Sequence, residues 1–118
     1  MMRPPSFTVM HGAIRLRVRV LPTEADVHRA YQAAPGSKAL RGFAVRAFFL
    51  GTASNRNSGT IYLPARGRLA ELVPHEVAHA VIHAHGGVLP ADDEACCLAI
   101  GRLTADILSG ITRMGVAV

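Results

Sequence analysis

Cysteine is scarce in this chain: Cys96 and Cys97 are the only two among its 118 residues. They are adjacent, so in a helix their side chains point about 100° apart and a disulfide between them is not expected. Adjacent cysteines also lack the C-x-x-C spacing that brings two thiolates to one metal ion. This excludes a disulfide framework, and we expect both residues to be small buried hydrophobic side chains.

Long apolar runs are also missing. The run AVRAFF is short and interrupted by Arg46, whereas about 20 apolar residues are needed to cross a bilayer. The first twenty residues, MMRPPSFTVMHGAIRLRVRV, have prolines and a histidine where a secretory signal would have its apolar stretch. We therefore expect no membrane span and a cytoplasmic protein.

Lysine is nearly absent, because the net charge of +5 comes from twelve arginines and a single lysine. In the segment IRLRVRV, strand alternation places Arg15, Arg17 and Arg19 on one face and aliphatic residues on the other. No aromatic residue is interleaved with these arginines, so bases would find no stacking platform there. We interpret this face as a solvated sheet face in preference to a phosphate-binding stripe, and nucleic acid is not an expected partner.

The length and the hydrophobic periodicity predict one domain, residues 1–118, of the α+β class. We expect a small antiparallel or mixed sheet of about three strands, packed on the helix that carries most of the histidines and on the helix after it. The TASNRNSG segment is predicted to be a turn or loop inside a hairpin. The expected strands are Ala13–Leu21, Phe43–Leu50 and Thr60–Leu63, and the expected helices are Glu24–Ala34, Leu69–His85 and Asp93–Leu108.

The stretch VPHEVAHAVIHAHGG contains an H-E-x-x-H motif in one of the predicted helices. His75 and His79 are one turn apart, separated by about 40° around the axis and about 6 Å along it, so both imidazoles can reach one ion. Glu76 lies beside them, placed to contact water at the metal and not the metal itself. This arrangement is typical of zinc sites that hydrolyse peptide bonds, with the glutamate as general base.

A third protein ligand is needed, and several candidates remain. His83 is about 12 Å along the helix from His75, too far to share the ion. His85 has the histidine spacing of the metzincin signature, but Ile82 stands where that signature has its turn-forming glycine. Glu94 belongs to a predicted inward stripe of the next helix, and Asp93 is its neighbouring alternative. The stripe, whose members follow helical spacing, consists of Glu94, Leu98, Gly101, Ala105 and Leu108.

From about Thr60 to Leu108, the strand GTIYLP, the helix ELVPHEVAHAVIH and the helix DDEACCLAIGRLTADIL together resemble the core of zincin metallopeptidases of the gluzincin type. The segment is similar to the small bacterial and phage-borne ImmA/IrrE-like members. The resemblance implies a minimal zincin fold with Zn²⁺ bound by His75, His79 and Glu94, and with Glu76 as catalytic base.

The same resemblance implies that Gly59 to Leu63 is the edge strand on which an extended peptide lies, with Gly59, Ile61 and Tyr62 as substrate-binding residues. Tyr62 and His85 are the candidates for stabilising the oxyanion. The expected function is zinc-dependent peptide hydrolysis of a peptide or protein substrate. The alternative is a zinc-bearing binding or regulatory module of a phage or bacterial system that is catalytically weak or inactive.

Overall fold

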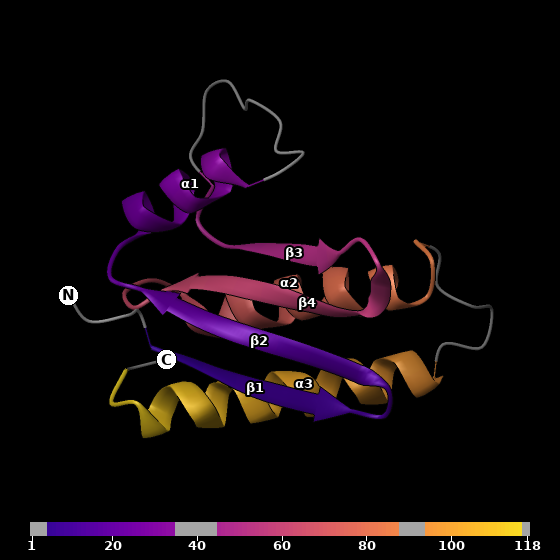
Figure 1. Cartoon of the computed structure of the whole chain (residues 1–118). Helices are drawn as coiled ribbons and strands as arrows, with labels where there is room; N and C mark the ends of the chain where they lie inside the picture. Colours follow the sequence, from indigo (N-terminus) through magenta and orange to yellow (C-terminus); the bar gives the residue numbers. More distant parts are fainter. Residues whose placement is uncertain (1–4, 35–44, 88–93, 117–118) are drawn as a thin grey trace.

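The computed structural model describes residues 5–34, 45–87 and 94–116, which form three helices and a four-stranded mixed sheet. The fold is therefore α+β, as predicted, with one more strand than expected. Figure 1 shows the sheet with α1 at one end and the long helices α2 and α3 running beside it. The elements are β1 (Ser6–His11), β2 (Ile14–Leu21), α1 (Glu24–Ala33), β3 (Phe48–Thr52), β4 (Asn55–Pro64), α2 (Leu69–Ala84) and α3 (Glu94–Arg113).

The strand order across the sheet is β1-β2-β4-β3. The pairs β1/β2 and β3/β4 are antiparallel, whereas β2 and β4 are parallel neighbours. Parallel neighbours need a crossover connection, and here α1 and β3 lie in the chain between β2 and β4. The predicted β3/β4 hairpin is confirmed, but its loop is a two-residue turn at Ala53 and Ser54, because Asn55 to Gly59 belong to β4.

Two helix assignments follow from local signals and are confirmed. Helix α1 begins after Thr23, whose hydroxyl accepts from the Asp26 backbone N–H while the Asp26 carboxylate accepts from the Thr23 N–H. Helix α2 buries Val73, Val77 and Val81, as its periodicity predicts. It starts at Leu69 and runs on through Pro74, although proline is favoured only in the first turn of a helix.

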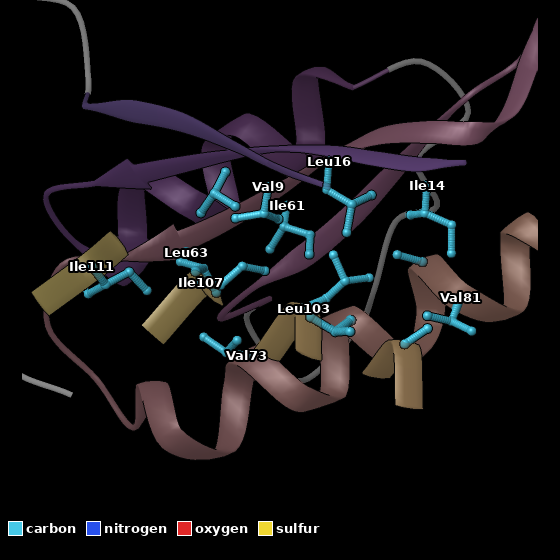
Figure 2. Close-up of a cluster of buried hydrophobic side chains, with 14 of the residues drawn as sticks. Val9, Ile14, Leu16, Ile61, Leu63, Val73, Val81, Leu103, Ile107 and Ile111 are labelled. Carbon is cyan, nitrogen blue, oxygen red and sulfur yellow. The ribbon is translucent and has the colours of Figure 1, made fainter. Parts of the chain in front are cut away.

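The core lies between one face of the sheet and the helices α2 and α3 (Figure 2). Alternate residues of β2 point into it, and β4 contributes Ile61 and Leu63. Helix α1 instead packs on the other sheet face, where Val27 meets Leu21 and Phe48. The sheet therefore separates a face covered by two helices from a face that α1 covers only in part.

Helix α3 is the one described helix long and apolar enough to cross a membrane by length and composition. In the structure it is instead part of the core, because Leu103, Ile107 and Ile111 are fully buried against the sheet and α2. The two cysteines in the first turn of α3 differ in burial. Cys96 is buried, as predicted, but Cys97 is exposed.

Helix α3 runs past Ser109 and Gly110, where the sequence predicted its end. The reason is packing: a Cβ atom at Gly110 would lie 2.5 Å from the Phe7 ring, so the glycine permits close approach of α3 to β1. Gly110 is therefore a packing contact with β1 and does not end the helix.

The two glycines of α3 make a matched test of this contact. Gly101→Ala adds a methyl group where nothing lies within 4 Å, so it is expected to stabilise the fold by about 0.5–1 kcal/mol through helix propensity. Gly110→Ala gains the same propensity but displaces Phe7, and we expect a net loss of about 1–2 kcal/mol. Urea unfolding of both variants measures the difference, and equal midpoints would contradict the packing account.

Candidate metal centre

Helix α2 presents the two motif histidines on one exposed strip. His75 and His79 are one turn apart, their Nε2 atoms are 3.2 Å apart, and their ring centroids are separated by 4.8 Å. Residues four apart on a helix are surface neighbours, which explains the geometry without help from any other element. The predicted pair of ligands is therefore brought together.

The distance between the two nitrogens fits a tetrahedral metal ion. Two nitrogen ligands at the usual zinc distance of about 2.0–2.1 Å stand about 3.3 Å apart in tetrahedral geometry, close to the 3.2 Å between His75 Nε2 and His79 Nε2. Burial, and after it the neighbouring His75, lower the pKa of His79. This favours the neutral imidazole, which is the form that binds a metal ion.

Glu76 differs from the histidines because it is buried, with 5% of its surface exposed. Burial raises the pKa of its carboxyl group, and the nearby His75 and a backbone hydrogen bond from Phe49 of β3 oppose that rise. Its Oε2 lies 3.9 Å from His75 Nε2. A carboxylate with a raised pKa beside two potential ligands is suited to proton transfer.

A cleft of about 640 Å³ opens over these residues, between α2 and strand β3. A neighbouring hollow of about 410 Å³ shares His75 and Glu76 with it and continues past Val45 and Arg46. Both hollows follow the chain segment that leads into β3. The cleft is lined by Tyr31, Val45, Ala47, Phe48, Phe49, Gly51, His75, Glu76, His79, Ile82, His83 and Gly87.

The strand beside the cleft is β3, and the prediction that Gly59 to Leu63 forms an edge strand is wrong. Those residues belong to β4, which pairs with β2 on one side and β3 on the other. With both neighbours in place, β4 has no free edge for an added peptide strand. The error arose because the sequence does not reveal that β2 pairs with β4.

The three residues predicted to bind substrate are occupied in other ways. Ile61 is fully buried in the core. Gly59 lies under the Phe49 ring, which stands 2.4 Å from the position of a Cβ there. Tyr62 points to the opposite sheet face from α2 and stacks on Phe48, with ring centroids 4.4 Å apart. Tyr62 is thus separated from the histidines by the sheet, which argues against its role at the oxyanion.

Glu94 is at the start of α3, is exposed, and does not line the cleft. Within residues 5–34, 45–87 and 94–116, no three His, Cys, Asp or Glu side chains gather closely enough to hold a metal ion. His85 does not join the pair either: its Nε2 is 3.5 Å from Cys96 Sγ and its Nδ1 is 2.9 Å from the Val81 carbonyl oxygen. Asp93 lies outside the described residues.

The prediction of which α3 residues face inward is wrong. Leu98 is 61% exposed, and Gly101 and Ala105 are exposed too. The core face consists of Cys96, Ala99, Leu103, Ile107 and Ile111. Both sets repeat at helical spacing, and the set with the larger aliphatic side chains is the one that packs inward. Burial therefore gives no support to Glu94 as an inward-facing carboxylate.

His83, which the sequence placed too far along the helix to share the ion with His75, is half-buried and lines the cleft. Its ring makes an edge contact with Phe49, and a Cβ at Gly51 would lie 2.5 Å from its Nε2. Among the described residues, this buried Nε2 has no hydrogen-bond partner. Tyr31 of α1 is a second cleft residue that the sequence did not indicate, because its approach depends on tertiary structure.

Comparison with known proteins adds no relative. No protein-family model matches the chain, and no curated protein and no solved structure matches it. The case for the metal centre therefore depends on the motif and on the geometry of α2 and β3.

The raised pKa of Glu76 has a consequence for stability in zinc-free protein. Because the folded state holds this proton more tightly than the unfolded state, the resulting stability is fully present below the unfolded pKa and is lost as the pH rises through the folded pKa. Glu76→Gln is neutral at every pH. It is expected to raise the melting temperature near pH 7, with a gain that shrinks towards about pH 4. Thermal melts of the parent and of Glu76→Gln in chelator, at several pH values, would measure the gain in melting temperature. A gain that does not change with pH would contradict the raised pKa of Glu76.

Proposed function

We propose that this protein is a zinc-dependent metallopeptidase of the H-E-x-x-H class. The observation that carries the proposal is the pair of Nε2 atoms 3.2 Å apart on α2, with the buried Glu76 beside them in the lining of a cleft. Two imidazole ligands with a carboxylate beside them as general base are the groups that this chemistry uses, together with a third protein ligand.

In the proposed reaction, His75 and His79 hold the zinc ion and Glu76 acts as general base. When bound, zinc would lower the pKa of water towards neutrality and polarise the scissile carbonyl group. Glu76 accepts the proton of the attacking water and delivers it to the leaving amine. Burial supports this role, because it brings the proton affinity of the carboxylate closer to that of its partners at neutral pH.

The third zinc ligand is proposed to come from the connection between α2 and α3 or from its end, with Glu94 first and Asp93 or His85 as alternatives. Bringing Glu94 to His75 and His79 requires a change from the described arrangement, since no three-ligand group forms in it. Glu94→Gln and Asp93→Asn distinguish the two carboxylates: the variant of the true ligand loses zinc affinity, and the other retains it.

The proposed substrate is an extended peptide or protein segment that lies along β3. β3 is an edge strand, and Phe49 already directs its backbone N–H to Glu76. In an extended strand, alternate residues present backbone groups to the same edge, so Gly51 shares the orientation of Phe49, and Ala47 immediately precedes the strand. Both line the cleft. We also propose that the protein is cytoplasmic and has no membrane partner.

A second candidate function is a zinc-bearing binding or regulatory module without efficient catalysis. It is favoured by the gathering of only two ligands among the described residues and by the position of Tyr62 across the sheet from the cleft. The cleft is lined by a different tyrosine, Tyr31 of α1. The two functions share the metal and differ in turnover.

Incubation with unfolded casein distinguishes them. Cleavage is expected in buffer and in 1,7-phenanthroline, which chelates zinc poorly. It is expected to stop in the chelating isomer 1,10-phenanthroline and to return with added zinc. Zinc binding without cleavage of casein or of candidate partner proteins would contradict the peptidase and favour the binding module.

A further inference from the structure

Strand β2 carries three arginines on the sheet face turned away from α2 and α3. Arg15, Arg17 and Arg19 alternate with aliphatic residues that point into the core. Cross-strand pairing places mostly polar side chains from both neighbouring strands beside the arginines, with Met10 as the apolar exception. Across the sheet, Ser6 and Tyr62 flank Arg19, Thr8 and Thr60 flank Arg17, and Met10 and Ser58 flank Arg15. We call these three side chains the arginine row.

No acidic side chain neutralises the arginine row in the described parts of the chain. None of the ion pairs there involves the three arginines. Helix α1, which covers one end of this face, has its acidic residues Glu24 and Asp26 paired with Arg46 and Arg29. Like charges on neighbouring positions repel one another, so a row of this kind favours a polyanionic partner.

The spacing of the row suits a polyanion with regularly placed charges. Alternate residues of a strand are about 7 Å apart, similar to the interval between successive phosphates of an extended nucleic-acid strand. Guanidinium groups bind phosphate through two parallel hydrogen bonds. The hydroxyls of Thr8 and Thr60, on either side of Arg17, are further donors of the kind that contact phosphates.

The aromatic side chain beside the row is not free to stack on bases. Tyr62 already stacks on Phe48, and the Arg19 guanidinium carbon lies 5.7 Å from its ring centroid. Arg15 and Arg17 are exposed, whereas Arg19 is half-buried. Binding would therefore be through phosphates and with little base preference.

We propose that the arginine row binds the phosphate backbone of single-stranded nucleic acid without sequence preference. The row and the histidines of α2 lie on opposite faces of the sheet, and none of the three arginines lines the cleft. The proposal therefore does not depend on peptidase activity or on bound zinc.

The test is fluorescence anisotropy with short labelled oligo-dT and oligo-dA over a range from 50 mM to 200 mM salt. The parent is expected to bind both with a Kd of about 10⁻⁴–10⁻⁶ M and a log–log salt slope of about −2, corresponding to three phosphates. Arg15→Gln/Arg17→Gln is expected to weaken binding about 10-fold and to reduce the slope to about −0.7.

The matched control is Arg66→Gln/Arg68→Gln, which removes the same charge from exposed positions in the loop before α2. Circular dichroism checks that both double variants fold. Equal weakening in the two would show a net-charge effect and overturn the proposal, as would unchanged binding in the first. Tighter binding to the corresponding duplex, or binding to phosphatidylserine vesicles with none to oligonucleotides, would also overturn it.

Discussion

His79→Ala is expected to reduce bound zinc from about one ion per chain to nearly none, with an affinity at least 100-fold lower than the parent. Loss of a residue that only orients a ligand already costs about 10–100-fold, and His79 is proposed to be a ligand itself. The described structure brings no third protein ligand to His75 and His79. Removal of one imidazole therefore leaves zinc with one protein ligand in the described part of the chain. Metal analysis of purified protein, followed by competition with a fluorescent zinc chelator, gives the two values.

His83→Ala is the matched control, because it removes a histidine one turn further along the same helix. Its Nε2 lies against Gly51, its ring makes an edge contact with Phe49, and it forms no three-ligand group with the pair. We expect this variant to keep zinc within a fewfold of the parent affinity. Zinc lost equally from the two variants, or kept by His79→Ala, would contradict the assigned ligand pair.

Glu76→Gln is expected to lower the rate of peptide hydrolysis by about 10²–10⁴-fold, the usual contribution of a general base. The amide keeps the shape of the side chain and its contact with β3 but cannot accept the proton. Since Glu76 is not a proposed ligand, zinc content should stay at the parent value. The rate of casein cleavage and the zinc content are measured on the same preparation.

Asp106→Asn, the same acid-to-amide change at a residue of α3 that does not line the cleft, controls for loss of charge. It is expected to leave the rate unchanged. Parent-like cleavage by Glu76→Gln would exclude the carboxylate as base, and zinc loss in that variant would indicate that Glu76 is a ligand.

The elements that the sequence predicted well are those with strong local signals. Strand β2 has strict alternation, and α1 has the Thr23–Asp26 capping box. Strand β1 was missed, since its pattern is less regular, with a half-buried Phe7 and a single buried residue, Val9. The end of α3 was misplaced because Gly110 has a tertiary role as a contact with Phe7.

The candidate site divides in the same way. The pairing of His75 and His79 follows from helical geometry alone, so the motif was enough to predict it. The edge strand was assigned to β4 in place of β3 because strand order depends on the parallel pairing of β2 and β4, which no local pattern reveals. The packing face of α3 was likewise ambiguous, since two stripes had helical spacing.

Zinc-edge anomalous diffraction from crystals grown with zinc tests the central claim most directly. The account predicts one strong peak about 2.0–2.1 Å from both His75 Nε2 and His79 Nε2, with Glu76 near it but not bound to it. The same map identifies the third ligand. Zinc found only elsewhere on the protein, with His75 and His79 left in contact with each other, would contradict it.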